Sequence, residues 1–80
     1  MTQINVRYYA ILREQAGMTH QSIDTPAHTA DALFTELSAA HGFTVPRNLM
    51  KVAINGEFCD FSRVLNAHDE VVFIPPVAGG

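Results

Sequence analysis

The chain has 80 residues, a net charge of −3 and a single cysteine. This length predicts one small domain with a marginal core, which excludes a large catalytic cleft and favours help from a partner or an oligomer. The five scattered lysine and arginine residues argue against binding to nucleic acid or an anionic membrane. A lone cysteine excludes an internal disulfide, and neither an apolar leader nor a membrane-length stretch is present, so we expect a cytoplasmic protein.

The first part of the chain predicts two strands joined by a helical turn. Residues 4–8 alternate apolar and polar side chains, the period of a strand with one buried face. Residues 10–15 are good helix formers, and Gly17 can end the turn at positive φ. Residues 20–24 alternate more weakly and run into Thr25-Pro26, which indicates a short edge strand.

One long helix is expected next. Thr29 is a suitable N-cap, and Asp31 in the first turn interacts favourably with the helix dipole. Gly42 is a suitable C-cap, with Phe43 closing a Schellman arrangement, so the helix should end near His41. Apolar residues at helical spacing predict one face packed on the sheet: Ala30, Leu33, Phe34, Leu37 and Ala40.

A strand and a hairpin are expected after this helix. Residues 52–54 are β-rich, and Asn55-Gly56 is the strongest hairpin signal in the chain, so Phe58 and Cys59 should pair back. The next segment, 60–65, predicts an irregular bridge with a helical turn. Its apolar anchors are expected to be Phe61, Val64 and Leu65.

Residues 71–74, Val-Val-Phe-Ile, predict the last strand. The order of elements then indicates a single α+β domain over residues 1–80. This last strand is apolar on both faces, although the chain has only one long helix to cover a sheet. Either one face is open to a partner, or the strand is central and buried on both faces, and the sequence leaves both readings open.

Residues 75–80, Pro-Pro-Val-Ala-Gly-Gly, predict an extended C-terminal tail. Pro75 and Pro76 stiffen its exit from the last strand. Gly79 and Gly80 carry no Cβ, so a carboxylate on Gly80 can enter a narrow channel. The alternative is a frayed, inert end, but a strand followed by two prolines and two glycines favours a functional tail.

No self-contained active site is visible. The four histidines lack the spacing of metal ligands, and the acidic neighbours of Cys59 disfavour its thiolate, so we expect no metal and no bound cofactor. The Gly80 carboxylate is the distinctive chemical group. Because a carboxylate is a poor electrophile, another enzyme must activate it, most simply as an acyl-adenylate made from ATP. Sulfur would then give a thiocarboxylate, and an amine would give an isopeptide.

Three segments resemble the small subunits of molybdopterin synthase. They are Tyr9-Ala10-Ile11-Leu12-Arg13-Glu14, Val52-Ala53-Ile54-Asn55-Gly56 and the terminal run from Asp69 to Gly80. The resemblance implies the ubiquitin-like β-grasp fold, a mixed sheet packed on one main helix. One position departs from the family pattern, because His68 stands where a glycine is usual. If that turn requires positive φ, His68 must adopt it at some cost.

The resemblance also implies a mechanism and a partner surface. A ubiquitin-activating-type adenylyltransferase would adenylate Gly80 with ATP, and a sulfur donor would make the thiocarboxylate. The synthase large subunit, in a heterotetramer, would receive the tail and pass sulfur to a pterin precursor in molybdenum cofactor biosynthesis. The reactive end would be Gly79 and Gly80. The partner-binding residues would be Tyr9, Phe58, Ile74, Pro75, Pro76 and Val77.

Three other functions stay open on sequence alone. The chain would be a sulfur carrier for another pathway, such as thiamin or cysteine synthesis, if its tail docked on a different acceptor. It would be a ubiquitin-like protein modifier if an amine received the activated tail. It would be a binding module if the tail were inert.

Overall fold

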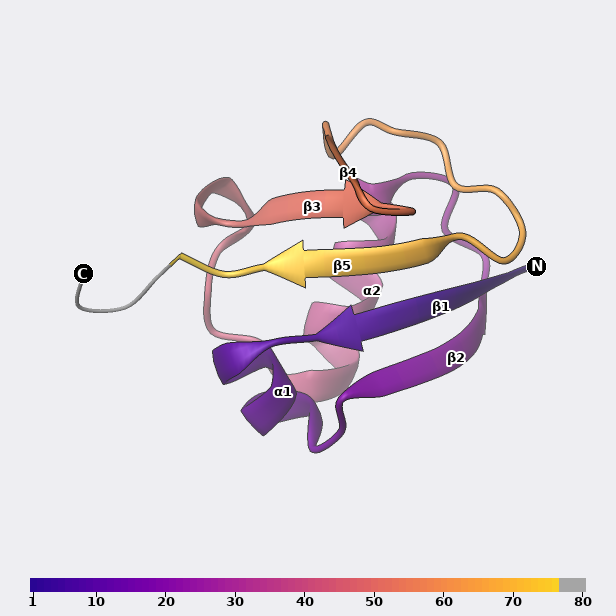
Figure 1. Cartoon of the computed structure of the whole chain (residues 1–80). Coiled ribbons are helices and arrows are strands. Elements are labelled where there is room, and N and C mark those ends of the chain that lie inside the picture. Colours follow the sequence, from indigo (N-terminus) through magenta and orange to yellow (C-terminus); the bar gives the residue numbers. More distant parts are fainter. Residues whose placement is uncertain (77–80) are drawn as a thin grey trace.

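Two layers, a five-stranded sheet and one long helix, make up the part of the chain that the computed structural model describes, residues 1–76 (Figure 1). In chain order the elements are β1 (Thr2–Tyr8), α1 (Ala10–Ala16), β2 (His20–Thr25), α2 (Ala30–His41), the 3-10 turn η1 (Arg47–Leu49), β3 (Lys51–Ile54), β4 (Glu57–Cys59) and β5 (Glu70–Ile74). The strands and the two α-helices agree with the sequence prediction. The turn η1 lies in the connection between α2 and β3.

The sheet has the strand order β2-β1-β5-β3-β4. The β1–β5 pair is parallel and the other three pairs are antiparallel, so the sheet is mixed, as the β-grasp resemblance implied. The last strand in sequence is therefore the central strand in space. Hydrogen bonding to β1 on one side and to β3 on the other fixes the point at which the chain leaves the sheet.

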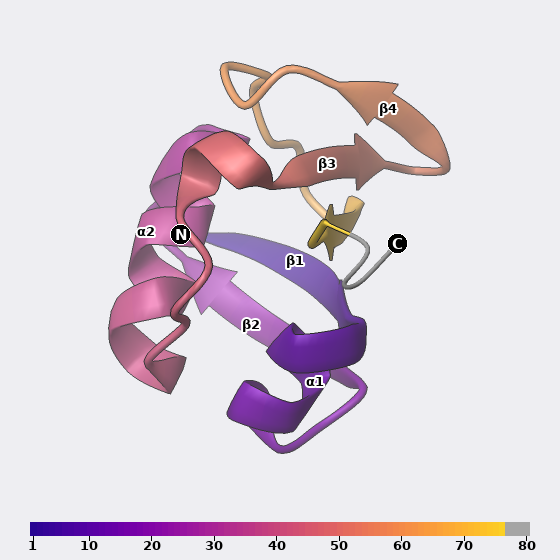
Figure 2. The same ribbon diagram turned by 90° about the vertical axis from the view of Figure 1, so that its left-hand side faces the viewer.

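Helix α2 covers one face of the sheet, and no helix covers the centre of the other face (Figure 2). On the covered face, Val71 and Phe73 of β5 are fully buried, and the Phe73 ring packs edge-on against Phe34 of α2 with centroids 5.2 Å apart. On the other face, Val72 and Ile74 are half-buried. Both sequence readings thus hold in part, because β5 is central and none of the helices in residues 1–76 covers the centre of its second face.

The caps of α2 bear out its expected limits. The Thr29 side chain accepts a hydrogen bond from the Ala32 N–H at 3.2 Å. At the other end Gly42 has φ 71°, and its N–H donates to the Ser38 carbonyl at 2.8 Å. That single bond is the αL motif rather than the expected Schellman motif. The buried face is also one turn shorter than predicted, because Ala40 is exposed.

The bridge over residues 60–65 is irregular, as predicted, and its turn is a single hydrogen bond from the Arg63 N–H to the Asp60 carbonyl rather than a helix. Phe61 and Leu65 pack on the core, as expected. Val64 does not, since it is 60% exposed. Its backbone pairs with Thr29 in an isolated antiparallel bridge, and the alternation of an extended chain turns Val64 outward where it turns Leu65 inward.

A buried carboxylate fixes the start of β5. Asp69 accepts hydrogen bonds from the Asn55 side chain at 2.9 Å and from the Asn66 N–H at 2.8 Å, and it lies 3.6 Å from Arg63. Burial alone would raise the pKa of Asp69, but these hydrogen bonds and the Arg63 charge outweigh it and lower the pKa below its usual value. His68, just before it, has φ 67°, the positive value anticipated from the family glycine.

Candidate partner surface and tail exit

The tail leaves the sheet from its central strand. β5 ends at Ile74, Pro75 is buried and Pro76 is exposed. Figure 1 shows this exit at the opposite end of the sheet from the N-terminus. The other predicted tail residues, Val77, Gly79 and Gly80, lie outside the described residues, so their predicted roles stay predictions.

The face away from α2 is called here the open face, and it consists of an apolar half and a polar half. Strand register aligns one row of side chains across all five strands, namely Phe58, Ala53, Val72, Arg7 and His20. The first three, from β4, β3 and β5, are apolar. The last two, from β1 and β2, are polar. Contiguous apolar area on a sheet that one helix covers on one side only is typical of an interaction surface.

The predicted contact residues Tyr9, Phe58 and Ile74 fall on this face. Phe58 is 70% exposed and lies in the same row as Val72. Ile74 is half-buried and follows Val72 by two positions on β5, so its side chain is on the same face. Tyr9 is 47% exposed. It directly follows Tyr8, the register partner of Phe73, so its extended backbone lies level with Ile74. The structure therefore brings the three residues to one side of the sheet, near the tail exit.

Sequence reasoning missed two residues of this surface. Val72 shares a face with Ile74 by strand alternation, and that parity was a signal available in the sequence. Lys51 is exposed on β3, which is an interior strand, and it is the register partner of Ile74. Nothing in the local sequence indicates this pairing, because the two residues are 23 positions apart in the chain and meet only through the sheet.

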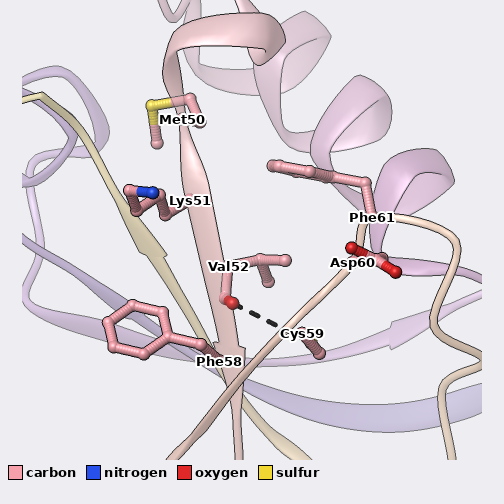
Figure 3. Close-up of a pocket in the computed structure, with 7 residues that line it drawn as sticks. All are labelled: Met50, Lys51, Val52, Phe58, Cys59, Asp60 and Phe61. Carbon is pink, nitrogen blue, oxygen red and sulfur yellow. Dashed lines mark hydrogen bonds between the residues drawn. The ribbon is translucent and has the colours of Figure 1, made fainter.

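A hollow of about 410 Å³ lies beside the apolar half. It opens between β3 and the segment that leaves β4, and Figure 3 shows its lining, which consists of Met50, Lys51, Val52, Phe58, Cys59, Asp60 and Phe61. The lining is mostly apolar. The half-buried Cys59 thiol lies 3.8 Å from the Val52 carbonyl oxygen, which fits a strand side chain rather than a nucleophile.

The polar half carries a charged pair, Arg7 and Glu70, that is only weakly held together. Arg7 Nε lies 3.5 Å from Glu70 Oε2, and both side chains are about half exposed, so the pair contributes little to stability. A smaller hollow of about 180 Å³ is lined by these two residues together with Asn5, Val6, His20 and Gln21. Its mixed charge does not define a site for one class of ion.

Behind the open face, a partly buried polar cluster holds the end of β1. The Tyr8 hydroxyl donates to Gln21 Oε1 at 2.7 Å, and His41 Nε2 lies 3.1 Å from the same oxygen. Burial raises the pKa of Tyr8 to about 12. The cluster ties β1 to β2 and to the end of α2, so it supports the backbone that presents Tyr9.

Within residues 1–76, no three histidine, cysteine, aspartate or glutamate side chains are grouped so as to hold a metal ion. None of the helices in this range is long and apolar enough to cross a membrane.

The mixed five-stranded sheet wrapped on one long helix is the ubiquitin-like β-grasp fold. The model of the ThiS family matches residues 6–80, and the chain belongs to this family of sulfur carriers. The chain is 38% identical to the molybdopterin synthase sulfur carrier subunit of Chlamydomonas reinhardtii, over 98% of this chain and 99% of the relative. It is 31% identical to the human protein of the same name, over 100% and 97%.

Solved structures with this fold include carriers and modifiers. SAMP1 of Haloferax volcanii, a small archaeal modifier protein, superimposes with a TM-score of 0.79 at 25% identity, over 98% of this chain and 99% of that one. A chain in the complex of subunits 1 and 2 of the Helicobacter pylori molybdopterin-converting factor superimposes with a TM-score of 0.68 at 21% identity, over 99% of this chain and 100% of that one. The latter likeness shows the fold alone.

Proposed function

We propose that this chain is the sulfur-carrier subunit of a molybdopterin synthase and that Gly80 carries the sulfur. The observation that supports this best is the full-length similarity to two proteins of that name, together with a family match that runs through residue 80. The element order alone would fit any ubiquitin-like protein, whereas these relatives share one stated role.

The proposed chemistry takes place on the tail. A ubiquitin-activating-type adenylyltransferase uses ATP to join AMP to the Gly80 carboxylate, and pyrophosphate leaves. A sulfur donor then displaces AMP and leaves a thiocarboxylate. The sulfur passes to a pterin precursor, and water restores the carboxylate. ATP belongs to the activating enzyme, so this chain binds no cofactor of its own.

The fold suits such a carrier because the tail continues directly from the central strand of the sheet. β5 is bonded on both sides, and Pro75 and Pro76 restrict the direction of the exit. A partner that docks on the sheet therefore meets the tail at a defined position. Gly79 and Gly80 let the end enter a narrow active site, since neither carries a Cβ.

The proposed partner is the synthase large subunit, in a cytoplasmic heterotetramer, docked on the apolar half of the open face. Phe58, Val72 and Ile74, with Tyr9 beside them, supply apolar area near the tail exit. Aromatic anchors of this kind often dominate binding energy. The Helicobacter pylori complex of subunits 1 and 2 is consistent with such a partner.

The test is the intact mass of the chain after incubation with the adenylyltransferase, ATP and a sulfur source. We expect a gain equal to the replacement of one oxygen by sulfur, located at Gly80 by peptide mapping, followed by transfer to the pterin precursor. A chain lacking Gly79 and Gly80 is the control. An unchanged mass with a demonstrably active enzyme would contradict the proposal. Transfer to a thiamin or cysteine precursor, with none to the pterin, would reassign the pathway.

The second candidate is a protein modifier, favoured by the likeness to SAMP1. In that case the activated Gly80 would form an isopeptide bond with lysines of other proteins. The same incubation without a sulfur source, in the presence of a cell extract, would then give conjugates of higher mass that contain this chain. A sulfur carrier gives none.

A further inference from the structure

The outer edge of β2 is a long strand edge without the usual protection. β2 is the last strand on one side of the sheet, and no strand of residues 1–76 pairs with its outer side (Figure 1). Native proteins usually protect such edges with lysine, proline, a bulge or a very short strand. β4, the other edge strand, has only three residues. β2 has six, includes no lysine or proline, and pairs with β1 residue for residue without a bulge.

The hydrogen bonds between β1 and β2 identify which backbone groups face outward. The Tyr8 N–H donates to the Thr19 carbonyl at 2.9 Å, so these two residues extend the β1–β2 register by one hydrogen-bonded pair. Bonded and non-bonded pairs alternate along an antiparallel ladder. Every second residue of β2 after Thr19 therefore bonds to β1. The N–H and C=O groups of the intervening residues point away from the sheet, and these are His20, Ser22 and Asp24.

The side chains of these three residues leave the edge open. All three are exposed and lie on the open face, where His20 is the register partner of Arg7 and Ser22 is the register partner of Asn5. The Ser22 hydroxyl donates to the Asn5 side-chain oxygen, so it does not bond to the outward backbone groups. His20 Nδ1 lies 3.3 Å from the Thr19 hydroxyl, which leaves Nε2 for another partner.

One register suits the pairing of this edge with the same edge of a second copy. About a twofold axis at Ser22, the two Ser22 residues face each other, and His20 of each copy lies opposite Asp24 of the other. All the outward residues of both copies then lie in bonded pairs, each of which exchanges two N–H···O bonds. A shift by two residues either sets Pro26, which has no N–H, opposite His20, or places Asp24 opposite Met18, beyond the start of β2.

We propose that this chain forms a homodimer by antiparallel pairing of two β2 strands in this register. The charges are complementary, because an imidazole N–H of His20 donates to the Asp24 carboxylate of the second copy, and Arg7 adds positive charge in the same row. The contact is the same patch on both copies, so it closes at two chains and occupies both open edges of β2. It does not depend on the chemistry proposed for Gly80.

This dimer leaves the proposed partner surface free. The apolar half of the open face belongs to β5, β3 and β4, on the opposite side of the sheet from the β2 edge. A twofold axis perpendicular to the sheet keeps both open faces on one side and turns the two copies in opposite directions. A contact of one strand pair is smaller than the roughly 1,200 Å² of a standard interface, so we expect a transient dimer with a Kd on the order of 0.1–1 mM.

The test is a concentration series of the full chain across that range, followed by amide NMR spectra and sedimentation equilibrium. We expect the amide signals of His20, Ser22 and Asp24 to shift with concentration while the apparent mass rises toward that of a dimer. Ser22→Pro removes an outward N–H, which an edge position facing solvent tolerates, so the fold should persist and the Kd should rise roughly tenfold or more. Ser22→Ala keeps the N–H and should associate like wild type.

A charge exchange tests the register without altering the backbone. His20→Asp sets two carboxylates opposite each other and should raise the Kd up to roughly fivefold, whereas the double variant His20→Asp with Asp24→His exchanges the pair and should restore the wild-type Kd. A monomer throughout the series would overturn the proposal, as would failure of the exchange to restore association. Concentration-dependent shifts at Phe58 and Val72 in place of β2 would overturn it by assigning association to the apolar half. Shifts of the β2 amides only when the large subunit is added would assign the edge to that partner and overturn it equally.

Discussion

Replacing Phe58 by alanine should separate partner binding from folding. Phe58 is 70% exposed in the unbound chain. An aromatic side chain buries about 150–250 Å², so a partner covering Phe58 removes roughly 100–175 Å² more from water. At about 25 cal/mol per Å², Phe58→Ala should cost about 2–4 kcal/mol of binding free energy, because alanine retains part of the area. This is roughly a 30- to 700-fold weaker Kd.

The free energy of unfolding should hardly change, by less than about 0.5 kcal/mol, because the unbound state already exposes most of the ring. The assays are calorimetric titration against the large subunit and urea denaturation of the isolated chain. Val64→Ala is the matched control. Val64 is 60% exposed, but it lies on the bridge to Thr29, at the start of α2 and away from the open face.

We expect Val64→Ala to bind like wild type. The reasoning is refuted if Phe58→Ala also binds like wild type, or if the control loses as much affinity as Phe58→Ala does. A large loss of stability in Phe58→Ala would show instead that the ring belongs to the core.

Three further predictions concern β5 and its approaches. Ile74→Glu should abolish binding to the large subunit and keep the fold, since Ile74 is half-buried on the open face; unchanged affinity or an unfolded circular dichroism spectrum would contradict it. His68→Gly should raise the free energy of unfolding by about 0.5–1 kcal/mol. Glycine relieves the backbone strain at φ 67° in the folded state, and this gain exceeds the extra conformational entropy that glycine gives the unfolded chain. If urea denaturation shows no gain, the turn is not strained. Folding lowers the pKa of Asp69. Its carboxylate therefore stabilises the fold above the unfolded pKa of about 4, and this stabilisation is lost as the pH falls through the lower folded pKa. In Asp69→Asn, the free energy of unfolding should therefore fall less steeply as the pH is lowered. An equally steep fall in Asp69→Asn would assign acid unfolding to other carboxyl groups.

Local signals in the sequence determined most of the elements of the fold. Alternation found β1, and Thr29 and Gly42 bounded α2 within a residue, because caps act through bonds to near neighbours. The Asn55-Gly56 turn likewise defined the β3–β4 hairpin. The sequence prediction was wrong where burial depends on contacts with residues far away in the chain. Val64 is apolar but exposed, because its backbone pairs with Thr29, and no local pattern encodes that pairing.

The resemblance in the sequence supplied the tail hypothesis and the three contact residues, but only the tertiary structure related them in space. Strand order is set by which long-range pairs bury the most apolar area, and such pairs leave no periodic trace in one sequence. The parallel pairing of β1 with β5 brings Tyr9 level with Ile74, and the β3–β5 pairing sets Lys51 beside the root of the tail. By itself, the sequence determined the stiff proline pair and the narrow glycine end of the tail, because these properties follow from the covalent geometry of single residues. The tertiary structure decided that the open face and the Lys51 side chain lie next to Ile74, where the tail begins, because those neighbours depend on pairing across the sheet.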